Sequence, residues 1–238
     1  MGAILPNSDE GQGSTRSIRS CYKEKMRNLV ILGAGGFAKE VFDLGNYCYG
    51  NDPSFKIKGF LSDNPSDIEA YGYPPVLATV DGYDIEKDDV FIPGIGNVKD
   101  RKKVVEKILR KGGKFINLVH PSAVISPSVK LGTGVAIKAF SVLASNVVIG
   151  DYTFLQSSVI CGHDVQIGNF CHINSFSFFA GCVKVNDLVT INAGARIVQS
   201  KLIGKGSTIG IGSVVIKDIP ENAKVFGNPA RLIDEGYL

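Results

Sequence analysis

A six-residue hydrophobic period dominates the second half of the chain. Every sixth residue from 119 to 215 is apolar, and the residue four places after each is small or β-branched, with Lys201 as the exception. A large aliphatic side chain followed by a small one, every six residues, suits a narrow triangular coil whose sides are short strands. The pattern predicts a left-handed parallel β-helix of hexapeptide repeats with 18 residues per coil.

Glycines mark one corner of this predicted coil. Five positions spaced 18 residues apart form one lattice along the chain: Gly132, Gly150, Gly168, Asn186 and Gly204. Glycine and asparagine accept positive φ angles at low cost, so we interpret these positions as left-handed corners. An antiparallel sandwich would not keep a fixed period of six, and about five and a half coils are expected to stack.

The first half shows the alternation of a small α/β domain. The predicted strands are residues 28–32, 56–61, 89–93 and 114–118, and the predicted helices are residues 37–47 and 98–111. This order calls for a parallel sheet with helices on its faces. We therefore expect a Rossmann-like domain at 26–118 and a β-helix domain with a C-terminal tail at 119–238, preceded by a disordered extension at 1–25.

A glycine-rich turn follows the first predicted strand. Residues 33–38 read GAGGFA, which fits the G-x-G-x-x-A pattern of phosphate binding at a helix N-terminus. Asp63 follows the next strand, where an acidic residue contacts a ribose or base. Only half of a dinucleotide fold is present, so a mononucleotide such as that of a sugar nucleotide fits better. Alternatively, the glycines only permit close packing of strand and helix.

Composition narrows the classes of partner. A net charge of +3 over 238 residues, without a basic run, argues against nucleic acid. No apolar stretch approaches the ~20 residues that a membrane span needs. The five cysteines form neither a CxxC pair nor a zinc spacing, which is typical of reduced thiols in a cytoplasmic protein.

His163 is the candidate for catalytic chemistry. It lies two residues past the inward column, so its ring is expected outside the core, and the adjacent Asp164 could orient it as a general base. Gly181 follows one coil later and could offer its N–H to an oxyanion. We expect no cysteine beside His163 except Cys161, whose side chain points inward, so acyl transfer would proceed without a covalent intermediate.

His172 lies nine residues after His163, which is half a coil. The two rings are therefore expected on different sides of one prism, and a single chain would not bring them together. Packing three prisms around a threefold axis would place one side of each against another side of its neighbour. The spacing predicts an active site between subunits.

Four segments together resemble a known family. They are residues 33–41 (GAGGFAKEV), 119–123 (VHPSA), 162–164 (GHD) and 225–231 (VFGNPAR). The combination resembles the bacterial sugar O-/N-acetyltransferase family, which includes sialic acid O-acetyltransferases and nucleotide-4-amino-sugar N-acetyltransferases. The resemblance covers nearly all of residues 26–238.

The resemblance implies a homotrimer that binds acetyl-CoA along the β-helix between subunits and a nucleotide-activated amino sugar in the N-terminal domain. It assigns the catalytic base to His163 and its acidic helper to Asp164, and it implies no metal. The implied acetyl-CoA contacts are His172, Gly181, Ala193 and Ile211. The implied nucleotide contacts are Gly35, Gly36, Phe37 and Asp63.

Two departures concern the acceptor. Some amino-sugar members carry a histidine where Phe37 stands, and an asparagine where Gln156 stands. Both leave the acetyl chemistry intact. The leading hypothesis is acetylation of the 4-amine of a nucleotide-linked deoxysugar for surface glycan synthesis, with O-acetylation of sialic acid or another sugar hydroxyl as the alternative.

The sequence argues against two further classes of function. Metal-dependent hydration of carbon dioxide needs three convergent histidine ligands, whereas His120 is remote from His163 and His172 in the sequence and is expected at the domain junction. A purely structural β-helix would leave the alignment of His163, Asp164 and Gly181 without a purpose.

Overall fold

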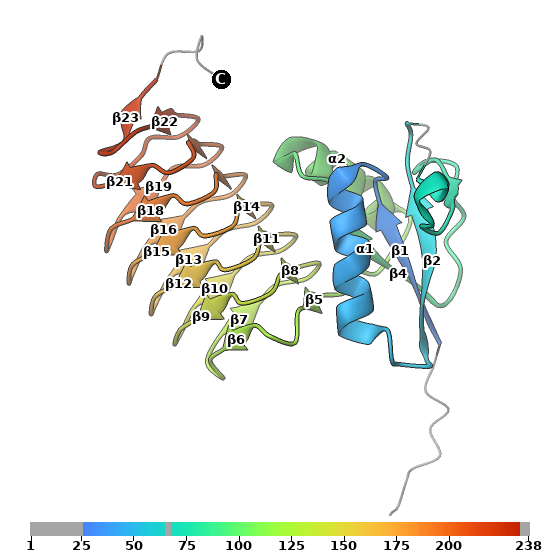
Figure 1. Cartoon of the computed structure of the whole chain (residues 1–238). Coiled ribbons are helices and arrows are strands. Elements are labelled where there is room, and N and C mark those ends of the chain that lie inside the picture. The colour runs from blue at the N-terminus through green and yellow to red at the C-terminus, as the bar shows by residue number, and fades with distance from the viewer. Residues whose placement is uncertain (1–25, 65–67, 234–238) are drawn as a thin grey trace, which may run out of the picture.

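The chain forms a small α/β part and a long parallel β-solenoid that lie side by side (Figure 1). The computed structural model describes residues 26–64 and 68–233. The predicted disordered extension, residues 1–25, lies outside the described residues. The predicted fold class, an α/β part followed by a parallel β-helix of hexapeptide repeats, is confirmed.

Two-residue strands recur every six residues along the solenoid, from β5 (Leu118–Val119) to β21 (Val214–Val215). Between them lie β6 (Val124–Ile125), β7 (Lys130–Leu131), β8 (Ala136–Ile137), β9 (Val142–Leu143), β10 (Val148–Ile149), β11 (Phe154–Leu155), β12 (Ile160–Cys161), β13 (Gln166–Ile167), β14 (His172–Ile173), β15 (Phe178–Phe179), β16 (Lys184–Val185), β17 (Thr190–Ile191), β18 (Arg196–Ile197), β19 (Leu202–Ile203) and β20 (Thr208–Ile209). β22 (Lys224–Phe226) and β23 (Arg231–Leu232) follow them.

These strands form three sheets, one on each side of the triangular coil. The five-stranded sheet runs from β7 to β19, the six-stranded sheet from β6 to β21, and the eight-stranded sheet from β5 to β23. Each strand of a coil pairs in parallel with the strand 18 residues later, as Phe154 does with His172. The predicted 18-residue coil is confirmed.

The six-residue column fills the axis of the solenoid. From Ile137 to Val215 each of its side chains is at most 3% exposed. The second column is buried beside it, and its hydroxyl groups donate to backbone carbonyls: Ser141 Oγ to Gln156 O at 3.0 Å and Thr153 Oγ1 to Gly168 O at 2.7 Å. Buried hydroxyls with acceptors are tolerated in a core, so this narrow interior accommodates polar residues.

The predicted role of the corner glycines is wrong. None of Gly132, Gly150, Gly168, Asn186 and Gly204 has a positive φ; that conformation occurs two residues later, at positions such as Tyr152 and Phe170 (both φ 55°). The glycines lie instead where successive coils touch. A Cβ on Gly150 would stand 2.6 Å from the carbonyl carbon of Gly168. Close approach of backbones, rather than left-handed geometry, requires glycine there.

The α/β part contains a four-stranded parallel sheet of order β3-β2-β1-β4. Its elements are β1 (Arg27–Leu32), α1 (Gly36–Tyr49), β2 (Phe55–Leu61), η1 (Glu69–Tyr71), β3 (Val76–Ala78), β4 (Asp89–Pro93) and α2 (Val98–Arg110). The strand predicted at 114–118 is wrong: only Phe115 bridges to Phe91, and Leu118 already belongs to β5. Sequence analysis missed β3, which is only three residues long.

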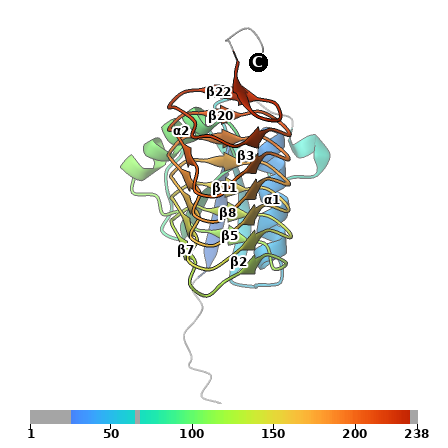
Figure 2. The ribbon, with the colours of Figure 1, turned by 90° about the vertical axis from the view of Figure 1, so that its left-hand side faces the viewer.

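Helix α1 packs between the four-stranded sheet and the eight-stranded sheet of the solenoid (Figure 1). One hydrophobic cluster joins the two parts, with Leu44 of α1 and Phe154 of β11 among its buried members. Viewed from the solenoid side, the α/β part lies behind one side of the prism (Figure 2). No helix among residues 26–64 and 68–233 is long and apolar enough to cross a membrane.

Candidate active site

His163 lies at the corner between β12 and β13, with its side chain 59% exposed. Its Nδ1 is 2.8 Å from Asp164 Oδ2, and Asn146 Nδ2 donates to Asp164 Oδ1 at 3.0 Å. These two hydrogen bonds, that of His163 first, lower the pKa of the Asp164 carboxyl. An ionised carboxylate only accepts, so Nδ1 is the donor to Asp164 and Nε2 is the nitrogen left for another partner.

Gly181 lies one coil above His163, as the spacing predicted. A Cβ on Gly181 would stand 2.5 Å from Nε2 and 2.6 Å from Cε1 of His163, so the ring rests against the bare Cα. Within the described part of the chain, the Gly181 N–H donates to no acceptor. The structure therefore brings together His163, Asp164 and Gly181, the residues predicted as base, orienting group and N–H donor.

The expectation about cysteines near His163 is wrong. Cys161 is fully buried in the inward column, but Cys182, which follows Asp164 by one coil, brings its Sγ within 4.8 Å of both the His163 ring and the Asp164 carboxylate. Side chains at the same corner of successive coils stack, so the 18-residue spacing that relates His163 to Gly181 also relates Asp164 to Cys182 and could have predicted this contact.

His172 faces the α/β part from β14 and is only 6% exposed. Its ring lies 5.1 Å from that of Phe37 and 6.2 Å from that of Phe154, and Gln156 Nε2 is 3.4 Å from its Nε2. The two departures noted in the sequence, Phe37 and Gln156, thus meet at one histidine. Burial first, and then the charge of Arg101, lowers the pKa of His172 to about 4, so the ring is neutral at neutral pH.

We predict that His172 makes the folded state sensitive to acid. The unfolded side chain titrates near its reference pKa of ~6.5, so between about pH 6.5 and 4 the unfolded state binds a proton that the folded state excludes, and stability falls as the pH falls. Arg101 and Lys138, the cations that act on this ring, both oppose its protonation. Between pH 7 and 4.5, the free energy of unfolding should therefore fall by about 2 kcal/mol less in His172→Gln than in wild type.

Urea unfolding of both proteins at the two pH values measures this difference, with His120→Gln as the control. An identical loss of stability in wild type and His172→Gln would contradict the prediction.

Arg101 of α2 is a residue that sequence analysis missed. Its guanidinium is fully buried, lies 4.1 Å from the ring centroid of Phe154, and donates from Nη2 to the carbonyls of Phe170 and Cys171, both at 3.3 Å. Burial lowers its pKa to about 9. In the sequence it shares the helical spacing of the apolar residues Val98, Val105 and Ile108, and this spacing is the signal that could have placed it on the buried face of α2.

A cavity of about 560 Å³ lies at the carboxyl ends of β1, β2 and β4. All four residues predicted to contact the nucleotide line it: Gly35, Gly36, Phe37 and Asp63. The N–H groups of Gly36 and Phe37, in the first turn of α1, have no acceptor among the described residues. Such a helix start with open N–H groups suits a phosphate.

Among the glycines of the motif, close packing accounts for Gly33 but not for Gly35 or Gly36. Gly33 has a φ of 102°, and a Cβ there would stand 3.0 Å from Ile95 Cγ1. The neighbouring loop after β4 is also tightly packed at Gly94. A Cβ on Gly94 would stand 2.9 Å from the Cα of Ala38, whereas a Cβ on Gly35 or Gly36 meets nothing within 4 Å. These two glycines therefore leave space above the helix start that the fold itself does not fill.

Asp63 lies at the rim of this cavity with other partners. Its Oδ1 accepts from the Val80 N–H at 2.9 Å, and Oδ2 is 3.8 Å from Lys107 Nζ. The carboxylate thus connects the end of β2 to the segment after β3 and to α2, and nucleotide contact by Asp63 stays a prediction.

The residues predicted to contact CoA further along the solenoid share one groove. Ala193 and Ile211 line a cavity of about 380 Å³ together with Asn174, Asn192, Gly210 and Phe226. Ile211 is 64% exposed there. The 18-residue stacking of these two side chains is confirmed, and their contact with CoA stays a prediction.

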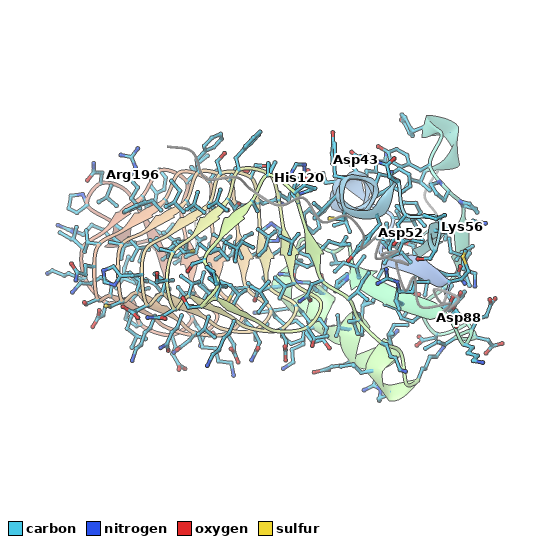
Figure 3. All side chains as sticks on the ribbon, turned by 90° about the horizontal axis from the view of Figure 1, so that it is seen from below. Asp43, Asp52, Lys56, Asp88, His120 and Arg196 are labelled. Atoms are coloured by element: carbon cyan, nitrogen blue, oxygen red, sulfur yellow. The ribbon has the colours of Figure 1, made fainter. Side chains whose placement is uncertain are left out.

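Within one chain, the residues predicted for the active site lie in separate places. His163 lies at the corner between the six-stranded and five-stranded sheets, whereas His172 lies on the eight-stranded sheet that faces the α/β part, and the cavity of about 560 Å³ lies within the α/β part. His120 lies at the junction near Asp43, beside α1 (Figure 3), where its ring packs on Tyr47 and its Nδ1 contacts Ser122 Oγ at 2.8 Å. The three histidines do not converge on one site.

Two family models match the chain over separate ranges. Residues 28–108 match the family described as the PglD N-terminal domain, and residues 116–208 match the GMPPB C-terminal domain. The chain is 30% identical over 218 residues to the GDP-perosamine N-acetyltransferase of Escherichia coli O157:H7, covering 84% of this chain and 94% of that protein.

Solved structures show the same architecture. PerB from Caulobacter crescentus, in complex with CoA and GDP-perosamine, matches with a TM-score of 0.78 at 30% identity, covering 87% of this chain and 97% of that one. The acetyltransferase domain of PglB from Neisseria gonorrhoeae FA1090, in complex with acetyl coenzyme A, matches with a TM-score of 0.79 at 29% identity, covering 87% and 100%.

Proposed function

Because the chain belongs to the left-handed β-helix family of bacterial nucleotide-amino-sugar N-acetyltransferases, we propose that it moves the acetyl group of acetyl-CoA to the 4-amine of a nucleotide-linked 4-amino-deoxysugar. The observation that carries the chemistry is the His163–Asp164 pair resting against Gly181. We place the enzyme in the cytoplasm and its product in the synthesis of a surface glycan.

The reaction follows from the positions of these groups. The sugar amine attacks the thioester carbonyl carbon, and Nε2 of His163 accepts the proton that the amine loses. The oxyanion that forms accepts a hydrogen bond from the Gly181 N–H, a contact worth about 3 kcal/mol in comparable sites. The C–S bond then breaks, the acetyl group stays on nitrogen, and the CoA sulfur leaves as the thiolate and takes up a proton.

Direct transfer needs both substrates present at once. PerB is described in complex with CoA and GDP-perosamine together, which supports a ternary complex in this family. Cys182 lies near His163, but a cysteine nucleophile is unnecessary when the amine can reach the thioester itself.

We place the complete site between two copies of the chain. His163 and His172 belong to the same coil, so a threefold axis parallel to the solenoid would hold the His163 corner of one copy level with the nucleotide cavity and His172 of its neighbour. The outer face of the six-stranded sheet supplies an apolar contact surface: Val124, Ile160 and Phe178 are 63%, 42% and 41% exposed. We therefore propose a homotrimer.

The nucleotide cavity and the N-acetyltransferase relatives favour an amine over a sialic acid hydroxyl as acceptor. Within one chain the three histidines lie at separate places, so a single copy offers no three-histidine metal site of the kind that carbon dioxide hydration needs.

A substrate panel tests the proposal. Acetyl-CoA is supplied with GDP-, UDP- and dTDP-linked 4-amino-deoxysugars, with the matching 4-hydroxy sugars as controls, and with free sialic acid. We expect release of the CoA thiol with at least one amino sugar and none with the hydroxy controls. Turnover of sialic acid alone would replace this proposal with O-acetylation.

A further inference from the structure

Three different ligand groups meet at the corner that carries His163. A ring nitrogen of His163, a carboxylate oxygen of Asp164 and Sγ of Cys182 all lie within 4.8 Å of one another. The proposed transfer reaction uses the first two and leaves the thiol without a role. A nitrogen, an oxygen and a sulfur donor at one surface point form a combination typical of zinc coordination.

The backbone holds these groups rigidly. Asp164 and Cys182 occupy equivalent positions of successive coils, with φ angles of 59° and 61°. The Asp164 N–H donates to Ser145 O, and the Cys182 N–H donates to His163 O, each at 2.9 Å. Asn146 Nδ2 donates to Oδ1 of the Asp164 carboxylate, the oxygen that does not contact His163. The ligand side chains therefore project from a preformed frame rather than from a loose loop.

We propose that His163, Asp164 and Cys182 bind a thiophilic divalent cation of the Zn²⁺ type and that the bound ion inhibits acetyl transfer. Donor atoms about 2.0–2.3 Å from tetrahedral zinc lie roughly 3.3–3.7 Å apart. Side-chain rotations that move the donor atoms by about 1 Å therefore bring them to coordinating distance. The thiol loses its proton to water on binding. Water completes the coordination, since the His163 and Asp164 side chains are 59% and 48% exposed.

The inhibition follows from competition for one imidazole. A metal ion on the His163 ring occupies the group that would accept the amine proton, and it draws the Asp164 carboxylate away from its orienting hydrogen bond. This part rests on the proposed role of His163 as the base, whereas binding of the ion does not. Sulfur and nitrogen donors select Zn²⁺ over Mg²⁺, which prefers oxygen ligands.

Binding is tested on the full chain after removal of metal with a chelator. Co²⁺ serves as the spectroscopic probe, because a cobalt–thiolate bond gives a charge-transfer band, and equilibrium dialysis measures Zn²⁺. We expect the band in wild type, its loss in Cys182→Ser, and a Zn²⁺ affinity at least about tenfold lower in that variant. Serine fits this backbone conformation, as Ser200 shows at the next coil with φ 58°. Cys48→Ser is the matched control and should behave as wild type.

Inhibition is measured by chromatography of the acetylated sugar nucleotide, because the CoA thiol itself binds Zn²⁺. Zn²⁺ should abolish turnover of wild type and Cys48→Ser, while Cys182→Ser keeps its metal-free rate and resists the ion. A Co²⁺ spectrum without a thiolate band, or equal Zn²⁺ affinity with and without Cys182, would overturn the site. Binding through Cys182 without inhibition would overturn the regulatory role and count against His163 as the base.

Discussion

Replacing His163 with alanine is expected to lower kcat by about 10²–10⁴-fold, the range that a positioned general base contributes. The side chain lies outside the core, 59% exposed, with Asp164 as its hydrogen-bond partner in the chain. Its loss therefore leaves the solenoid packing intact. Steady-state kinetics with acetyl-CoA and the amino sugar nucleotide measures the effect, and sedimentation and thermal unfolding confirm that the assembly is unchanged.

His120→Ala is the matched control for this experiment. His120 is a half-buried histidine at the junction with α1, away from the His163 corner, and its replacement should leave kcat within about twofold. A rate near wild type in His163→Ala would remove this residue as the base and return the choice of proton acceptor to the groups around the nucleotide cavity.

Mixing two inactive variants is expected to restore activity if the site lies between subunits. The first variant is His163→Ala, and the second is Gly36→Glu, which places a negative charge at the start of α1. A Cβ on Gly36 meets nothing within 4 Å, so this change should spare the fold while repelling a phosphate. Each variant alone is expected to be nearly inactive.

In trimers assembled at random from equal amounts, about a quarter of the interfaces combine an intact His163 with an intact cavity from the neighbour. Coexpression followed by size-exclusion chromatography provides these mixed trimers. Recovery to about a quarter of the wild-type rate supports a shared site. No recovery in verified mixed trimers would place the base and the nucleotide cavity of one chain in the same site and contradict the proposed arrangement.

The sequence did not show which residues at the corners of the coil adopt positive φ angles. The six-residue period located each corner, but the left-handed residues are Phe170, Tyr152 and their equivalents rather than the lattice glycines. Bulky residues adopt this conformation because hydrogen bonds from neighbouring coils hold it, as the Tyr152 N–H does with Thr133 O. A periodic network of backbone hydrogen bonds therefore outweighs the low propensity of a single bulky residue for positive φ.

The contact between the two parts was likewise hidden in the sequence. The meeting of Phe37, Gln156 and His172 joins a glycine-rich turn to strands more than a hundred residues away. Arg101 belongs to the same contact. Its spacing from Val98 and Val105 places it on the buried face of α2, but that spacing does not show which backbone carbonyls it meets. Side-chain pairing across domains depends on docking, which local pattern does not encode.

The sequence by itself determined the solenoid, its 18-residue coil, the outward position of His163, and the stacking of Gly181 above it, because a strict repeat converts sequence spacing directly into height along one axis. It also located the glycine-rich turn at residues 33–38, which lines the cavity of the α/β part. Only the tertiary structure decided which side of the prism the α/β part covers, how deeply His172 is buried, and that Cys182 lies beside His163 and Asp164. Those outcomes depend on side-chain packing between segments with no fixed spacing, so they emerge only when the two parts meet.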